Sequence, residues 1–405
     1  MVTFAFIMNK IFYRLYQSIF RYASFFLPWR RPEILNSFDS LAALLAKKSV
    51  ESLLFITDSG LVTTGLHTSL IQTLERSHIH VIIYDKTLQN PTIDNIEEAL
   101  TMYHRERCTA IIAFGGGSPI DCAKGVGARV ARPGKSIPKM RGQLKVLKRM
   151  PLFIAIPTTA GTGSETTLAA VITDIITHEK YAITDPSLFP HYALLMPHLT
   201  IGLPPFMTAC TGMDALCHAV EAYIGHSNTK QTRKDALKAT ELIFKYLWTA
   251  YSDGQNIDAR KNMLDAAFLA GAAFTRAYVG NIHAVAHTLG GQYGTPHGLA
   301  NAVIMPYILE MYGDKIWKRL SEMAVAAGIA DKKTTTKGNS DQFIEAIRLM
   351  NEKMALPNKI SEILPKDIPT LASRALREAN PLYPVPVIFG KKEMEQVYYK
   401  IMKEE

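Results

Sequence analysis

Short apolar runs alternate with helix-like stretches from about residue 33 to residue 202. Four runs have the length of strands and end at turn residues: 53–57, 80–84, 110–114 and 153–156. Stretches with helical character, such as 93–103 and 119–131, lie between them. Because strands that are apolar throughout need cover on both faces, this alternation predicts a mainly parallel sheet with helices on both sides.

The pattern changes after Leu203-Pro204-Pro205, where long Ala-rich helical stretches follow without a convincing strand. A chain of 405 residues with 48% hydrophobic content has enough apolar material for two domains with their own cores. We therefore predict an α/β plus all-α fold in three segments: an N-terminal amphipathic extension at 1–32, an α/β domain at 33–202 and a helical domain at 203–405.

Composition narrows the class of protein. Charged residues make up 20% of the chain, too few for a disordered protein. The four cysteines show no CxxC spacing, which fits a reducing cytoplasm better than a disulfide framework. The net charge of +9 permits anionic partners, but no known nucleic-acid-binding motif accompanies it. We expect a cytoplasmic protein that does not bind nucleic acid.

Residues 1–31 are rich in Phe and Tyr and contain no acid. They carry five basic residues: Lys10, Arg14, Arg21, Arg30 and Arg31. No uncharged run approaches the roughly 20 residues of a membrane span, and arginines interrupt the stretch where a signal peptide would be apolar. The segment is either an interfacial amphipathic helix or an extra helix whose aromatic side packs on the first domain. We favour the packed helix and expect no membrane association.

Histidines and an aspartate in the second half of the chain have the spacing of metal ligands. Asp214 and His218 are four residues apart, so a helix places both on one face. His283 opens a similar pair with His287, and His297 follows in Gly-Thr-Pro-His-Gly. Three neutral imidazoles and one carboxylate suit Fe(II), Zn(II), Co(II) or Ni(II) better than Ca or Mg. Single histidines on apolar faces are usually core residues, so the spacing alone leaves both interpretations open.

A glycine-rich turn follows the third predicted strand. Gly115-Gly116-Gly117 ends this strand, and a helix is expected to begin around Ser118-Pro119, with Ser as the N-cap. Glycines let backbone amides approach a ligand, and the start of a helix offers N–H groups to a pyrophosphate. The pattern differs from the GxGxxG fingerprint, and a tight strand–helix turn is the alternative interpretation.

Two further loops have the chemistry of a dinucleotide site. Asp58 follows an earlier strand and is placed to accept hydrogen bonds from a ribose 2′-hydroxyl, although an ordinary turn residue would occupy the same position. The loop 157–165 follows the fourth strand and holds three threonines and two glycines. Small hydroxyl groups and glycines after a parallel strand favour phosphate or nicotinamide binding at the carboxyl edge of the sheet.

Four long motifs together resemble the iron-dependent, group III alcohol dehydrogenases. They are Gly-Gly-Gly-Ser-Pro-Ile-Asp, Pro-Thr-Thr-Ala-Gly-Thr-Gly-Ser-Glu, Thr-Gly-Met-Asp-Ala-Leu-Cys-His-Ala-Val-Glu-Ala-Tyr and His-Ala-Val-Ala-His with the later His-Gly-Leu-Ala-Asn-Ala-Val. The resemblance runs in order from about residue 33 to the C-terminus. It implies a dehydroquinate-synthase-like fold, with a dinucleotide-binding α/β domain, a helical metal-binding domain and the active site in the cleft between them.

The resemblance assigns expected roles to individual residues. The family's metal ligands correspond to Asp214, His218, His283 and His297, and its further active-site histidine near the nicotinamide corresponds to His287. Its cofactor contacts correspond to Asp58, Asn90, Gly116, Gly117, Ser118, Thr158, Thr159 and Lys180, and Asp121 completes the glycine motif. An acid at position 58 repels a 2′-phosphate, which favours NAD(H) over NADP(H). The chain departs from the family at Met196-Pro197-His198, where relatives often carry Asp-Pro-Glu, and at Ala169, which is Asn in some members.

These features predict a metal-dependent oxidoreductase that transfers hydride between NAD(H) and a small primary or secondary alcohol or aldehyde. Fe(II) is the expected metal, with zinc as the alternative, and the resemblance implies a homodimer or higher homo-oligomer. Two other functions are a glycerol(-phosphate) dehydrogenase or sugar-phosphate lyase on the same fold, and a non-catalytic membrane-surface module anchored by its N-terminus. The complete ligand set and the intact glycine loops argue against both.

Overall fold

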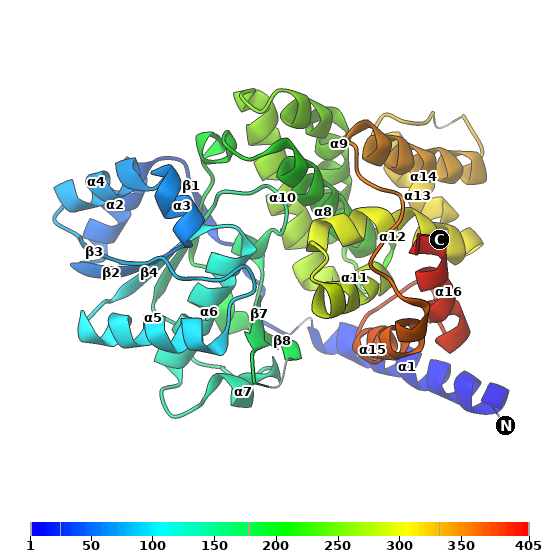
Figure 1. Ribbon diagram of the computed structural model, residues 1–405, viewed down its shortest axis with the longest axis horizontal. Coiled ribbons are helices and arrows are strands. Elements are labelled where there is room, and N and C mark those ends of the chain that lie inside the picture. The colour runs from blue at the N-terminus through cyan, green and yellow to red at the C-terminus, as the bar shows by residue number, and fades with distance from the viewer. Residues whose placement is uncertain (1, 25, 177–178, 332, 404–405) are drawn as a thin grey trace. The chain divides into compact units, whose positions relative to one another are not determined.

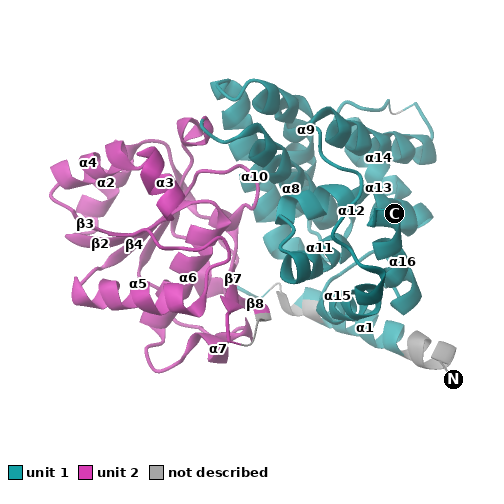
Figure 2. Cartoon of the chain, viewed as in Figure 1, with its two compact units in different colours: residues 1–27, 202–405 teal, residues 28–201 magenta. Residues whose placement is uncertain are grey.

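The chain forms two compact units, here called the α/β unit (residues 28–201) and the helical unit (residues 1–27 and 202–405), which Figures 1 and 2 show. The computed structural model describes residues 2–24, 26–176, 179–331 and 333–403. All nine strands of the described residues lie in the α/β unit. The predicted combination of an α/β part and an all-α part is confirmed.

The main sheet of the α/β unit has six parallel strands in the order β1-β9-β6-β4-β2-β3. The strands are β1 (Glu33–Leu35), β2 (Ser52–Ile56), β3 (His80–Tyr84), β4 (Ala110–Gly115), β6 (Leu152–Pro157) and β9 (Tyr192–Leu194). The four apolar runs of the sequence form β2, β3, β4 and β6. The two strands that the sequence analysis did not identify, β1 and β9, have three residues each, too few for a clear pattern.

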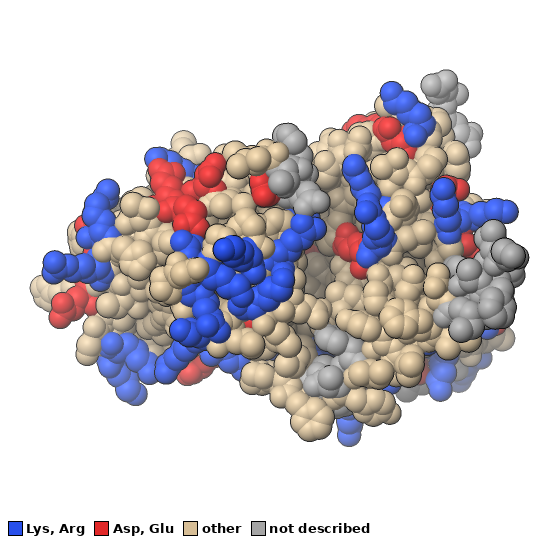
Figure 3. Space-filling model, turned by 90° about the horizontal axis from the view of Figure 1, so that it is seen from below, with Lys and Arg blue, Asp and Glu red and all other residues tan. Residues whose placement is uncertain are grey.

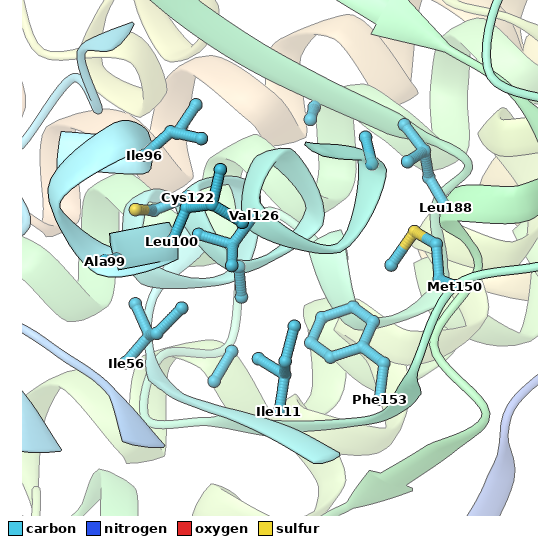
Figure 4. Close-up of a cluster of buried hydrophobic side chains, with 14 of the residues drawn as sticks. Ile56, Ile96, Ala99, Leu100, Ile111, Cys122, Val126, Met150, Phe153 and Leu188 are labelled. Atoms are coloured by element: carbon cyan, nitrogen blue, oxygen red, sulfur yellow. The ribbon is translucent and has the colours of Figure 1, made fainter. Parts of the chain in front are cut away.

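Side chains of the main sheet alternate between two apolar cores. Leu54 and Ile56 of β2 belong to the core beneath α5 (Ile93–Arg105) and α6 (Gly117–Ala131), part of which Figure 4 shows. Phe55 belongs to the core on the opposite face, beneath α2 (Phe38–Lys47) and α4 (Thr68–Arg76). Because successive residues of a strand point to opposite faces, strands covered on both sides are apolar throughout.

The chain leaves the neighbouring strands β2 and β4 toward opposite faces of the sheet. After β2 it continues into α3 (Ser59–Thr64) and α4, and after β4 it continues into α6. The carboxyl ends of β2 and β4 therefore form a topological switch point, where open α/β sheets bind their ligands. Asp58 and the Gly115–Gly117 turn both lie at this point.

A small second sheet completes the α/β unit and was not predicted. It contains β5 (Gly142–Gln143), β8 (Glu179–Thr184) and β7 (Ala169–Asp174), with β7 and β8 antiparallel. The remaining short elements of this unit are α7 (Ile137–Met140), η1 (Ser164–Thr166), η2 (Pro186–Leu188) and η3 (Pro197–Thr200). β8 mixes polar and apolar residues, which hides it from the pattern of apolar runs, whereas β7 begins with a short apolar run that the sequence analysis did not use.

The helical unit is built around α8 (Pro205–Ile224), which is buried along almost its whole length from Thr208 onward. Its neighbours are α9 (Lys230–Ser252), α10 (Ile257–Ala277) and α12 (His297–Tyr312). The other helices are α11 (Asn281–Tyr293), η4 (Gly313–Lys315), α13 (Trp317–Ala326), α14 (Thr336–Lys353), η5 (Pro365–Asp367), α15 (Ile368–Ala379) and α16 (Lys391–Ile401). Small residues such as Ala and Gly in α8 and α10 allow these helices to approach closely.

The N-terminal segment forms helix α1 (Val2–Ser24), which belongs to the helical unit. The guanidinium of Arg14 donates hydrogen bonds to the carbonyl oxygens of Val385 (2.7 Å) and Pro386 (2.8 Å). The side-chain amide of Gln17 donates to the carbonyl oxygen of Tyr383 at 2.7 Å. The prediction that this helix packs on the first domain is therefore wrong, because its polar residues attach it to the C-terminal part of the chain.

The outward side of α1 remains apolar. Its exposed large side chains include Ile11, Leu15, Ile19 and Tyr22, which recur every three or four residues and so lie on one face of the helix. Among the described residues, no helix combines the length and the apolar character that a membrane span requires.

Candidate metal centre and dinucleotide edge

The four predicted metal ligands meet inside the helical unit. Asp214 and His218 lie one turn apart on α8, His283 lies in the first turn of α11, and His297 begins α12. One ligand atom of each residue lies within 4.8 Å of those of the other three. Two ligand atoms on opposite sides of one ion lie about two metal–ligand bonds of about 2.1 Å apart. The observed separations are therefore of the order expected for a site that holds a single ion.

The donor atoms of this cluster face a common point. Nε2 of His297 lies 3.4 Å from Oδ1 of Asp214, and the rings of His218 and His283 stack with centroids 4.6 Å apart. The side-chain nitrogen of Asn301 donates to Oδ1 of Asp214 at 2.8 Å and lies 3.3 and 3.2 Å from Nε2 of His283 and His297. One carboxylate oxygen and two ring nitrogens thus surround the side-chain nitrogen of Asn301. Atoms with lone pairs that converge in this way also suit a cation. The residues therefore fit a divalent metal held by three nitrogen atoms and one oxygen atom.

Burial keeps His283 in the neutral form that a metal ligand requires. Desolvation, reinforced by the neighbouring His218 and His297, holds the pKa of His283 well below its usual value. Its Nδ1 lies 2.6 Å from Oε2 of Glu221, which leaves Nε2 to face the donor cluster. Pairing one ring nitrogen with a carboxylate orients the other nitrogen toward the metal in histidine-ligated sites.

Glu221 is itself fixed by the backbone at the start of α11. The N–H groups of Gly280 and Ile282 donate to its two carboxylate oxygens at 2.7 and 2.8 Å. The side chain is buried, and desolvation raises its pKa to about 7. Glu221 lies seven residues after Asp214 on α8. It therefore falls on the same helix face, a signal that the sequence analysis did not use.

A close crossing of α12 and α8 brings His297 to the cluster. A Cβ atom at Gly298 would lie 2.2 Å from the carbonyl oxygen of Cys210, so no other residue fits this position without a backbone shift. Gly298 directly follows His297, and the contact therefore sets the distance between His297 and the Asp214 face of α8.

Cys217 lies beside this centre but has the chemistry of a core thiol. Its Sγ is 3.7 Å from Nδ1 of His283, on the side of the ring that faces Glu221. Burial, with Glu221 and Asp214 nearby, raises the pKa of the Cys217 thiol well above its ordinary value. Only the thiolate is a strong metal ligand or nucleophile, so Cys217 serves as packing.

His287 points to a different carboxylate. Its Nδ1 lies 2.5 Å from Oε1 of Glu378 on α15, and the hydroxyl of Tyr383 donates to the same oxygen at 2.8 Å. The imidazole of His287 stacks on that of His297, with ring centroids 5.1 Å apart, and remains about one-third exposed. No local spacing indicates Glu378, because 91 residues separate it from His287.

The glycine-rich turn at the switch point is built as expected, with one difference. Helix α6 begins at Gly117 with Gly116 as its N-cap, so the prediction that Ser118 is the N-cap is wrong. Ser118 lies inside the first turn, and its hydroxyl donates a hydrogen bond to the carbonyl oxygen of Gln89. The residue before the cap, Gly115, ends β4 with φ of 147°, a conformation that favours glycine at that position.

The Gly115–Gly117 turn and the loop 157–165 pack against each other. The N–H of Thr158 donates to the carbonyl oxygen of Gly115 at 3.1 Å. A Cβ atom at Gly116 would lie 3.3 Å from Oγ1 of Thr159. The structure thus brings together the expected cofactor residues of both loops.

Asp121 connects the two loops. Its Oδ1 accepts a hydrogen bond from the hydroxyl of Ser164 at 2.7 Å, and its Oδ2 accepts one from the N–H of Val171 at 3.0 Å. The neighbouring Lys124 is fully buried and donates to the carbonyl oxygens of Ser164 (2.8 Å) and Ala169 (2.7 Å). These bonds give Asp121 a supporting role, and its expected contact with the cofactor stays a prediction.

The remaining expected cofactor residues, Asp58, Asn90 and Lys180, lie at two different positions in the α/β unit. Asp58 is the N-cap of α3, and its Oδ1 accepts a hydrogen bond from the N–H of Leu61 at 2.9 Å. Asn90 and Lys180 contact each other, with the Lys180 ammonium donating to Oδ1 of Asn90 at 2.8 Å. Asp58 thus lies at the switch point with Gly116 and has a structural use there in addition to the expected ribose contact.

Comparison with known proteins identifies the family. The profile of the iron-containing alcohol dehydrogenases matches residues 35–197, and that of the C-terminal part of the Fe-containing alcohol dehydrogenase family matches residues 208–402. The chain is 38% identical over 338 residues to alcohol dehydrogenase 4 of Schizosaccharomyces pombe, covering 82% of this chain and 79% of that protein. The chain belongs to the iron-containing alcohol dehydrogenase family.

Other relatives share both sequence and structure. The chain is 36% identical to 1,3-propanediol dehydrogenase of Klebsiella pneumoniae, over 81% of this chain and 85% of that protein. The crystal structure of a 1,3-propanediol oxidoreductase superposes with a TM-score of 0.88 at 31% identity, covering 92% of this chain and 98% of that one. The alcohol dehydrogenase of Oenococcus oeni gives the same TM-score at 30% identity, over 92% and 100% of the two chains. The chain is thus similar to these oxidoreductases over nearly its whole length.

Proposed function

We propose that this member of the family transfers hydride between NAD(H) and a small primary or secondary alcohol or aldehyde, with a divalent metal held by Asp214, His218, His283 and His297. The observation that carries the proposal is the convergence of these four donors on one point inside the helical unit. A metal at this point would bind the hydroxyl oxygen of an alcohol or the carbonyl oxygen of an aldehyde, which is why we propose these substrates.

The donor set determines what the centre does. Three neutral imidazoles and one carboxylate bind Fe(II) or zinc, and we propose Fe(II) from the family to which the chain belongs. The metal, when bound, supplies Lewis acidity that lowers the pKa of an alcohol and polarises a carbonyl group. The residues of this chain hold and orient it: Glu221 fixes the ring of His283, and Gly298 sets the position of His297.

We assign the dinucleotide to the switch point of the α/β unit. The first turn of α6 presents backbone N–H groups beside a glycine turn, which suits a pyrophosphate. Asp58 gives this edge a carboxylate that favours a ribose hydroxyl over a 2′-phosphate. A relative that is 34% identical over 80% of this chain, from Bacillus methanolicus, is named an NAD-dependent methanol dehydrogenase, which supports NAD(H) as the cofactor.

His287 is the proposed proton carrier. Glu378 holds its Nδ1, so Nε2 remains for a proton exchanged with the substrate oxygen or with solvent. Its partial exposure gives such a proton a route to water. The protein is proposed to act in the cytoplasm as a homodimer or higher homo-oligomer, with a small alcohol or aldehyde as its substrate.

A spectrophotometric assay tests the proposal. Enzyme loaded with Fe(II) or zinc should oxidise NADH in the presence of propanal, butanal or lactaldehyde and reduce NAD in the presence of the matching alcohols. A glycerol phosphate or sugar phosphate substrate should give no turnover, since these substrates belong to the disfavoured functions on the same fold. The absence of activity with every aldehyde and alcohol, in enzyme shown to hold metal, would contradict it.

A further inference from the structure

Helix α1 of the helical unit carries an exposed apolar seam, formed by Phe12, Leu15, Ile19 and Tyr22. Each of the four side chains is more than half exposed, from 55% for Phe12 to 69% for Tyr22. Successive members of the seam are separated by three, four and three positions. Alternating steps of three and four average 3.5 residues, which is the repeat by which two α-helices pack against each other along their length. The seam therefore has the periodicity of a helix–helix contact.

The side of α1 opposite to the seam is attached to the C-terminal part of the chain. Gln17 lies on this side and is only 5% exposed. Its side-chain amide donates to the carbonyl oxygen of Tyr383, and the guanidinium of Arg14 donates to that of Val385, both at 2.7 Å. Because these bonds hold the helix in place, a partner meets a seam that is already formed. Pairing through the seam therefore does not require the helix to be ordered first.

The positions that flank the seam carry no charge. In a pair of helices with this repeat, the residues on either side of the seam meet those of the partner and decide which helices pair. In α1 these residues are Asn9, Ile11, Tyr16 and Ser18. An identical helix would therefore meet no like charges along the contact, so the seam is compatible with a second copy of itself.

A membrane surface fits α1 less well than a second helix does. A helix that lies on an anionic membrane uses the basic residues of its polar side to contact lipid headgroups. In α1 the polar side contacts the protein instead, where Arg14 donates to the carbonyl oxygens of Val385 and Pro386. Figure 3 shows that basic side chains gather on the α/β unit, whereas uncharged side chains cover much of the visible face of the helical unit.

We propose that the α1 seam binds the same seam of a second copy of this chain in a symmetric two-helix contact. The contact removes four large side chains from water on each copy, which drives the association. It rests on the homo-oligomeric state proposed above and gives that state a specific surface. The family profiles match residues 35–197 and 208–402, so α1 lies outside the part of the chain that they cover.

Light scattering of the full-length enzyme during size-exclusion chromatography, over a series of protein concentrations, tests the proposal. Leu15→Lys places like charges opposite each other in the contact, so its assembly should have half the mass of the wild-type assembly. Leu349→Lys is the matched control, because Leu349 of α14 is 55% exposed, close to the 58% of Leu15, and lies outside the seam. Its mass should equal that of wild type. Unchanged melting temperatures show that both variants are folded, and Ile19→Lys replaces Leu15→Lys if that variant is unstable.

Three results would overturn the proposal. Equal masses for wild type and Leu15→Lys would do so, and if both exceed a monomer, the proposed homo-oligomer stands with a different interface. A wild-type enzyme that stays monomeric at every concentration would contradict both. Equal masses together with co-sedimentation of wild type, but not of Leu15→Lys, with phosphatidylserine vesicles would assign the seam to a membrane surface. None of these measurements depends on turnover, so the proposed oxidoreductase function is tested separately.

Discussion

Oε2 of Glu221 lies 2.6 Å from Nδ1 of His283, and this contact determines which nitrogen of the ring faces Asp214. The same carboxylate accepts the N–H groups of Gly280 and Ile282, so one buried acid positions both the ring and the helix that carries it. The proposed metal centre therefore includes a positioning residue that is not one of the four proposed ligands.

Replacing Glu221 should weaken metal binding without removing a ligand. We expect Glu221→Ala to lower metal affinity about 10- to 100-fold, the range typical of groups that orient a ligating histidine. Competition with a chelator, followed by metal analysis, measures the effect. Glu352→Ala removes an exposed acid of the same unit and serves as the control. Equal metal retention in both variants would show that Glu221 has no such role.

The Glu378–His287 contact should matter for turnover and not for cofactor binding. We expect Glu378→Gln to lower kcat about tenfold, because the neutral amide orients His287 less firmly for proton transfer. The dissociation constant of NADH, measured by fluorescence titration, should stay within about twofold of wild type. Tyr383→Phe removes the other hydrogen bond to the same Glu378 oxygen and should have a smaller effect. A normal kcat in Glu378→Gln would remove His287 from the proton route.

Asp58 requires a substitution that preserves its capping bond. Because its Oδ1 caps α3, Asp58→Gly would change stability and cofactor choice together. Asp58→Asn keeps the cap and removes the charge, so it isolates the electrostatic effect. We expect the ratio of kcat/KM for NADPH to that for NADH to rise about tenfold. An unchanged ratio with an unchanged melting temperature would mean that Asp58 is a capping residue only.

The N-terminal helix should contribute to stability through Arg14. Its two hydrogen bonds to the carbonyl oxygens of Val385 and Pro386 are partly buried, and we expect Arg14→Ala to cost about 1–2 kcal/mol. Thermal unfolding measures the loss, with Lys392→Ala as an exposed cation control in the same unit. Identical melting temperatures for Arg14→Ala and wild type would show that α1 is not held by these bonds.

The sequence predicted those elements of the fold and the site whose signal lies within one short stretch of the chain. The strands β2, β4 and β6 are buried on both faces, and the edge strand β3 is buried on one face and partly buried on the other, so their apolar runs were visible in the sequence. Asp214 and His218 were visible because one helix turn separates them. Residue type and spacing already suggested all four as metal ligands, and the resemblance to a family then assigned the same four.

Contacts between distant segments could not be predicted in this way. Glu378 reaches His287 across 91 residues, and Arg14 reaches Val385 across 371. The partner of α1 was predicted wrongly because an amphipathic pattern shows that a helix has an apolar side but not what covers either side. The cap of α6 is Gly116 and not Ser118, whose hydroxyl instead donates to the carbonyl oxygen of Gln89, a contact that the local pattern does not show.

The most direct test of the account is turnover of NADH with an aldehyde in wild-type and His283→Ala enzyme, each stripped of metal and then supplied with Fe(II). We expect wild type to lose activity on stripping and to regain it with Fe(II), while His283→Ala stays at least about a hundredfold slower than Fe(II)-loaded wild type under both conditions. NADH binding should be nearly unchanged in the variant, because the four residues are proposed to hold the metal and not the dinucleotide. Full activity in stripped wild-type enzyme, or normal turnover in His283→Ala, would contradict the account.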